Sequence, residues 1–180
     1  MPSCLGSVSR LGAHYDELPR VTRRIHEPDP VLLAEGQADV EGAETAAGRL
    51  LARIFGFPEA GRNQPVRVVI ETMPDGSERR AGVYPTRTMR SVMTRPDPAT
   101  QSIGEHFGSF QYRNALELER CGLASTPMYS HWYGIPLPRW LLPSVEATER
   151  ASADRHRLDV CIAMPLVGRL VRYRGRLQIR

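Results

Sequence analysis

The chain has 180 residues and a mass of 20.2 kDa, with 41% hydrophobic and 24% charged residues, a composition typical of a folded domain with its own core. All 24 basic residues are arginines, so these residues exclude any chemistry that needs a lysine amine. A GC-rich genome is enough to explain the missing lysines. The net charge is +4, but the arginines are scattered among acidic residues, and we expect no nucleic-acid partner.

Residues 1–9 are small and polar and are predicted to form a flexible arm, with residues 10–180 as a single α+β domain. Apolar residues at helical spacing predict a helix over residues 11–26, kinked or broken at Pro19. A strand over residues 31–40 follows, with Gly36 as a bulge. A second helix is predicted over residues 43–56, capped by Thr45 and ended by Gly56.

After residue 64 the period of the apolar residues changes from that of a helix to that of strands. Pro74, Asp75 and Gly76 predict a hairpin turn, and a short helical turn is predicted over residues 139–142. We therefore expect one large curved antiparallel sheet of about nine strands, which can roll into a partly open barrel, with the two N-terminal helices packed against it. The strands after the first pair are expected over residues 87–94, 101–107, 110–119, 123–133, 145–152, 157–166 and 169–179.

Several familiar sites have no counterpart in the sequence. Nucleotide-binding glycine loops, the HExxH metal motif and the GxSxG nucleophile motif are missing, and the five histidines lack metal-ligand spacing. The three cysteines lie far apart, which argues against a disulfide framework and fits a reducing compartment. We expect no cofactor, no metal, no signal peptide and no membrane span, and a cytoplasmic location.

A curved sheet covered by helices often encloses an apolar cavity, so polar residues on the apolar face of a strand are the candidate site residues. Asn114 shares one face of its strand with the apolar and aromatic residues Phe110, Tyr112 and Leu118. An inward asparagine is costly unless it has a hydrogen-bond partner, which would be either the backbone or a ligand. Phe110, Tyr112 and Leu118 are therefore predicted to contact a substrate.

The next strand supplies the candidate for acid–base chemistry. His131 shares one face with Tyr129 and Tyr133, provided that Pro127 does not shift the register. An imidazole titrates near neutral pH, so His131 and Tyr129 are predicted catalytic residues, whereas the alternative is a structural or surface histidine. Tyr133 and Trp132 are predicted substrate contacts, although a tryptophan beside such a proline-rich turn is more often a packing residue.

Two further features were weighed by the same alternation. Tyr173 faces inward if its neighbours Arg172, Arg174 and Arg176 face outward, and it is then a further catalytic candidate. The arginine stripe, defined as Arg172, Arg174 and Arg176, is either a solvated face or a surface for a partner. Glu105 and His106 are adjacent on a strand, so at most one of them can reach a cavity.

Three segments together resemble a known family. They comprise residues 18–28 with 34–71, residues 104–123 with 130–149, and residues 158–177, and the stretches GIPLPRWLLP and PLVGRLVRYRG are the most specific. They are similar to an uncharacterised bacterial domain of unknown function, found alone or fused to the C-terminus of saccharopine-dehydrogenase-like NAD(P)-binding oxidoreductases. The resemblance implies an α+β fold and a bacterial cytoplasmic setting, and it implies no reaction.

Three functions follow as hypotheses. The first is a cofactor-independent cyclase or isomerase that acts on a hydrophobic polyketide- or terpenoid-like substrate, with proton transfer by His131, Tyr129, Tyr173 or Asn114. The second is a non-catalytic module that binds a lipophilic ligand or serves an oxidoreductase partner. The third is an interaction domain that uses the arginine stripe, and a homodimer is compatible with all three.

Overall fold

The computed structural model describes residues 30–180, except for residues 96, 98, 101, 120–121 and 153–154, and except for the side chains of residues 116–119, 122–127, 139, 149 and 151–152. The flexible arm and the helix expected over residues 11–26 therefore lie outside the described residues.

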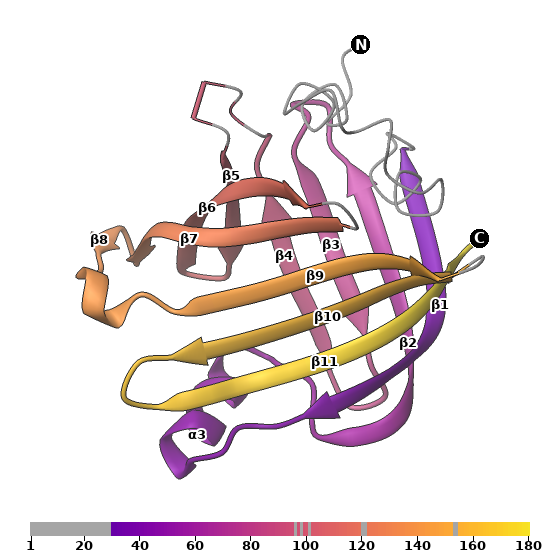
Figure 1. Ribbon diagram of the computed structural model, residues 1–180, viewed down its shortest axis with the longest axis horizontal. Coiled ribbons are helices and arrows are strands. Elements are labelled where there is room, and N and C mark those ends of the chain that lie inside the picture. Colours follow the sequence, from indigo (N-terminus) through magenta and orange to yellow (C-terminus); the bar gives the residue numbers. More distant parts are fainter. Residues whose placement is uncertain (1–29, 96, 98, 101, 120–121, 153–154) are drawn as a thin grey trace.

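Eleven strands form one antiparallel sheet, in the order β8-β7-β6-β5-β4-β3-β2-β1-β11-β10-β9. The sheet curls so far that β7 and β9 come side by side without forming a ladder, so it is strongly curved but not closed (Figure 1). The strands are β1 (Val31–Glu41), β2 (Gly61–Thr72), β3 (Glu78–Val83), β4 (Thr88–Met93), β5 (Ser102–Phe107), β6 (Phe110–Glu119), β7 (Gly122–Trp132), β8 (Ile135–Pro136), β9 (Ser144–Ser152), β10 (Arg155–Met164) and β11 (Gly168–Ile179).

One α-helix, α3 (Ala46–Ile54), and one 3-10 helix, η3 (Arg139–Leu141), occur in the described part of the chain. The expected packing of two N-terminal helices against the sheet is thus corrected to a single short helix among these residues. Thr45 caps α3 as predicted, because its hydroxyl accepts the Gly48 N–H at 3.0 Å. The same hydroxyl donates to the Val167 carbonyl at 2.8 Å, which ties the helix to the turn before β11.

The sheet bends along β1, whose inward positions carry small residues. Ala34 and Ala38 are fully buried, and Gly36 lies between them. A Cβ at Gly36 would collide with the carbonyl oxygen of Arg176 on β11, so this close approach requires glycine. The predicted bulge at Gly36 is wrong, because the register shift in β1 falls between Ala38 and Val40.

Aromatic residues fill one end of the space inside the curl. Phe55, at the end of α3, packs edge-on against Phe110 with ring centroids 5.8 Å apart, and Phe107 stacks on Tyr112 at 6.0 Å. Leu51 of α3 also packs on this core, whereas Leu50 and Ile54 of the same predicted apolar stripe are exposed. The helix and the aromatic cluster therefore cover one end of the curl and leave the middle of the concave face unfilled.

Among the described residues, no helix combines the length and the apolar character that crossing a lipid bilayer requires.

Candidate functional site

The concave face of the sheet holds a cavity of about 230 Å³, lined by side chains from β1 to β6 and from β9 to β11. Most of the lining is apolar, including Val68, Met89, Val145 and Leu177. Strands far apart in sequence supply opposite walls because the curl brings β9 and β10 in front of β3 and β4 (Figure 1). The described residues thus form a largely apolar cavity on the concave face of the sheet, as the curved sheet predicted.

A row of directly opposed residues crosses this wall from β3 to β7. Glu78 is opposite Met93, Met93 is opposite Glu105, Glu105 is opposite Tyr112, and Tyr112 is opposite Ser130. Opposed residues in an antiparallel ladder point to the same face, so the row presents two carboxylates, a phenol and a hydroxyl together. Three of these residues, Glu78, Glu105 and Tyr112, line the same wall of the largely apolar cavity.

Glu78 is neutralised by a neighbour on its own strand. The Arg80 guanidinium donates through Nε at 3.0 Å and through Nη2 at 2.7 Å to the same carboxylate oxygen of Glu78. Both side chains are largely buried, with 24% of Arg80 and 15% of Glu78 exposed. Such a charge-assisted pair satisfies the Glu78 carboxylate without a ligand.

Glu105 has a different partner. The Tyr112 hydroxyl donates to Glu105 Oε2 at 2.5 Å. Burial raises the pKa of Tyr112 well above its usual value, and the neighbouring Glu105 carboxylate adds to the shift. Tyr112 is therefore a protonated hydrogen-bond donor throughout the neutral range, and the described residues give Glu105 no cationic partner in an ion pair.

Asn114 follows Tyr112 on the same face of β6, as predicted. It is 4% exposed, lines the cavity, and its Oδ1 has no hydrogen-bond partner among the described residues. Ser130, beside Tyr112 on β7, is 2% exposed, and its Oγ is likewise without a described partner. Two buried oxygens with unused acceptor capacity thus flank the Glu105–Tyr112 pair.

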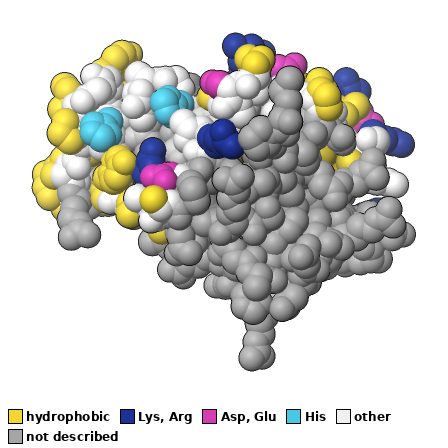
Figure 2. Space-filling model, turned by 90° about the horizontal axis from the view of Figure 1, so that it is seen from above, with side chains coloured by type: hydrophobic (Ala, Val, Ile, Leu, Met, Phe, Trp, Pro, Cys, Tyr) yellow, Lys and Arg dark blue, Asp and Glu magenta, His cyan; other side chains and the backbone are white. Residues whose placement is uncertain are grey.

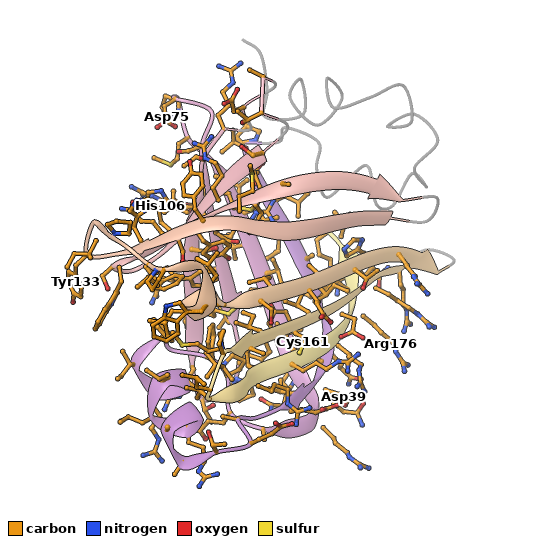
Figure 3. All side chains as sticks on the ribbon, turned by 60° about the vertical axis from the view of Figure 1, so that its left-hand side comes forward. Asp39, Asp75, His106, Tyr133, Cys161 and Arg176 are labelled. Atoms are coloured by element: carbon orange, nitrogen blue, oxygen red, sulfur yellow. The ribbon has the colours of Figure 1, made fainter. Side chains whose placement is uncertain are left out.

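Tyr173 lies inside the cavity, and the predicted alternation of β11 is confirmed. Tyr173, Gly175 and Leu177 line the cavity, whereas the arginine stripe faces outward. Tyr173 is close enough to Tyr112 to contribute to the raised pKa of that phenol. Figure 3 shows Arg176 projecting outward from the sheet.

Part of the arginine stripe is already paired. Arg172 makes a two-point contact with Asp159, at 2.9 and 2.8 Å, and holds the pKa of that carboxyl below its usual value. Arg174 reaches Glu41 at 2.9 Å. Two of the three arginines in the stripe therefore form ion pairs within the chain, which weakens the hypothesis that the stripe binds a partner.

The predicted inward orientation of His131 and Tyr129 is wrong. Tyr129 is opposite Arg113 and His131 is opposite Gln111, both on the outward face of β6, and the two rings contact each other there with centroids 5.8 Å apart. The cause is a register shift: Asn114 is opposite Pro127, but Arg113 is opposite Tyr129, so one extra residue reverses the alternation. Ser130 takes the inward position instead.

Only some of the aromatic residues predicted to contact a substrate lie at the cavity. Tyr112 lines the cavity, and Phe110 lies in the aromatic cluster that closes its end. Trp132 is 51% exposed, and Tyr133 is 75% exposed in the turn before β8, away from the cavity (Figure 3). The side chain of Leu118 lies outside the described residues. In Figure 2, hydrophobic side chains and two histidines gather at the end of the molecule that carries β8 in Figure 1.

The sequence analysis missed Glu78, Arg80 and Ser130 and left Glu105 undecided. A signal was present for Glu105, because Ile103 and Phe107 share its face and are apolar. For Glu78 and Arg80 the strand offers no comparable alternation. No group of three or more histidine, cysteine, aspartate or glutamate side chains in the described part of the chain is placed to hold a metal ion.

Comparisons with curated proteins and with solved structures find no match. The family comparison does find one, and it covers nearly all of the chain, including every strand of the cavity wall. This chain belongs to the family described as Domain of unknown function (DUF4166), whose model matches residues 18–177.

Proposed function

We propose that this chain binds a small, largely apolar molecule in its concave cavity and holds a polar group of that molecule against Asn114, Glu105 and Tyr112. The proposal keeps what the expected cyclase or isomerase and the expected carrier have in common. It moves the polar contacts from His131 and Tyr129 to the wall formed by β5 and β6.

The observation that carries the proposal is the Oδ1 of Asn114. A buried hydrogen-bond acceptor that has lost its water and gained no protein partner reduces the stability of the fold by about 1–3 kcal/mol. Native proteins rarely keep such a group without a reason. Asn114 is 4% exposed and lines an apolar cavity, so a ligand with a donor group would remove this cost. The volume of about 230 Å³ suits a compact ligand, since typical pockets span roughly 300–1,000 Å³.

Native mass spectrometry of the purified protein tests the proposal. We expect an apolar molecule that remains bound to the folded chain, or that binds after incubation with a lipid extract, and is released on denaturation. Asn114→Leu should weaken its binding by about 5- to 100-fold, the equivalent of one unpaired hydrogen bond. Gln111→Leu is the matched control, because Gln111 is on the same strand but is exposed on the outer face.

Two results would contradict the proposal. One is a protein that carries no adduct before or after incubation with the extract. The other is an adduct whose affinity is the same in Asn114→Leu as in Gln111→Leu, since the molecule would then bind elsewhere.

The Glu105–Tyr112 pair favours a second candidate, the isomerase-type chemistry expected from the sequence. A carboxylate beside a protonated phenol in an apolar cavity has the two groups that proton transfer needs. Glu105 would accept a proton from a carbon of the substrate, and Tyr112 would donate its own proton at another position. The proton on Glu105 would then pass across their hydrogen bond to the Tyr112 phenolate, which restores both groups. In D₂O, wild-type protein should then exchange deuterium into the bound molecule and Glu105→Gln should not, whereas a carrier exchanges none in either form.

A further inference from the structure

Three charged side chains line the described part of the cavity, and their charges do not cancel. Glu78 and Arg80 neutralise each other in a two-point contact. Glu105 remains, with the Tyr112 phenol as its hydrogen-bond donor. A half-buried carboxylate in an apolar wall is costly unless a counter-charge accompanies it, and the described wall of the cavity has two carboxyl groups but only one guanidinium.

The amide oxygen of Asn114 has the same preference as Glu105 for a hydrogen-bond donor. Asn114 Oδ1 is a hydrogen-bond acceptor without a described partner, it is nine-tenths or more buried, and it lines the same cavity. No guanidinium other than that of Arg80 lines the described wall, so an anionic ligand would find no free cation there. The site therefore offers acceptors and a negative charge to a ligand.

Aromatic rings complete the surroundings. Phe107 stacks on Tyr112, and the rings of Tyr84 and Tyr173 line the same cavity. The faces of such rings attract cations, with the largest effect where water is excluded. A carboxylate, an amide oxygen and several aromatic rings around one apolar space are the usual components of a site for an organic ammonium group.

We propose that the ligand of this cavity is a lipophilic amine, whose ammonium group pairs with Glu105 and donates a hydrogen bond to Asn114 Oδ1 while its apolar body contacts the aromatic and aliphatic wall. This inference rests on the proposed binding function and names the chemical class of the ligand. It gives Glu105 the role of a counter-ion.

Three probes with one apolar body and different polar groups test the inference: naphthylmethylamine, naphthylmethanol and naphthoate, titrated calorimetrically into the full chain at pH 7. The amine should bind at least about tenfold more tightly than the alcohol, the usual gain from a charged hydrogen-bond partner, and naphthoate should bind most weakly. In Glu105→Gln the amine should lose this advantage while the alcohol keeps its affinity. Glu146→Gln, on the outer face of β9, is the matched control and should change nothing.

The ranking in the wild-type protein decides the question even if Glu105→Gln fails to fold. Tightest binding by the alcohol or by naphthoate would overturn the amine inference and leave the proposed binding function intact. If none of the three probes binds and no molecule is found with the purified protein, the binding function itself is contradicted. Amine preference that survives unchanged in folded Glu105→Gln would place the amine at another site and would also overturn the inference.

Discussion

Asn114 allows stability and binding to be separated at one residue. Its side chain has no hydrogen bond to the described residues, and its Oδ1 is buried without a partner. Leucine has a similar shape and removes the unpaired oxygen, so Asn114→Leu should leave the free energy of unfolding unchanged or raise it by about 1 kcal/mol. Urea denaturation measures this, and a loss of more than about 1 kcal/mol would mean that the amide has a structural partner after all.

Tyr84 predicts a specific loss of stability at alkaline pH. Burial raises the pKa of this phenol from 10.0 to about 12 in the folded state. The native protein then holds the proton more tightly than the unfolded chain does. The resulting stabilisation is complete below pH 10 and is lost as the pH rises towards 12, by roughly 2–3 kcal/mol across that interval.

Tyr84→Phe should remove this part of the alkaline loss. Its free energy of unfolding, measured in urea at several pH values from 9 upward, should fall less steeply than that of the wild type. Tyr129→Phe is the control, because Tyr129 is 46% exposed on the outer face. Equal slopes in wild type and Tyr84→Phe would show that Tyr84 titrates normally.

At the scale of single strands, the close pairing of β1 with β11 depends on Gly36. A Cβ at this position would collide with the Arg176 carbonyl oxygen, which is backbone and cannot rotate away. Gly36→Ala should therefore destabilise the protein by about 3 kcal/mol, as overpacking against backbone does. Gly82→Ala is a matched control on β3, since its nearest neighbour would be the Tyr84 ring at 3.4 Å, and it should cost less than about 1 kcal/mol.

Chemical denaturation of both glycine variants tests this comparison. If Gly36→Ala is as stable as Gly82→Ala, then β1 and β11 do not approach as closely as described. The sharp bend of the sheet would in that case need another origin than the small residues on β1.

The strands also show what alternation in a sequence can predict. On β6 and β11 the apolar residues alternate without ambiguity, and the inward positions of Tyr112, Asn114 and Tyr173 were predicted correctly. On β7 one extra residue between Pro127 and Tyr129 reverses the faces, and nothing local in the sequence fixes where that residue is inserted. Tyr129 and His131, which follow the bulge, were therefore assigned to the wrong face.

The composition of the site follows the same division. The inward orientation of Glu105 could be predicted from the apolar residues two positions before and after it. Glu78 and Arg80, in contrast, form a pair within a strand that has no apolar alternation. The two residues share one face of β3, but the local sequence does not show that this face is the one that lines the cavity. The local pattern thus predicts which face of a strand points inward, and the pairing of the strands decides which polar side chains come into contact.

At the scale of the whole molecule, the curl of the sheet separates the cavity from both tryptophans. Trp132 ends β7 and is 51% exposed, and Trp140 in η3 is 64% exposed, while neither lines the described cavity. An exposed indole emits at nearly the same wavelength in folded and unfolded protein. We therefore expect native tryptophan emission close to that of the urea-unfolded chain, strong quenching by iodide, and no shift when a ligand fills the cavity.

This last expectation tests the arrangement of the fold as a whole, because it depends on β7 passing β9 and carrying the β8 end outward. Fluorescence spectra with and without iodide, recorded before and after addition of a non-fluorescent aliphatic alcohol, provide the measurement. Blue-shifted emission that iodide cannot quench would mean that the tryptophans are buried, by a second copy of the chain or by a different path of β7. If iodide quenching is lost only when the ligand is added, the ligand binds at the β8 end and not in the concave cavity.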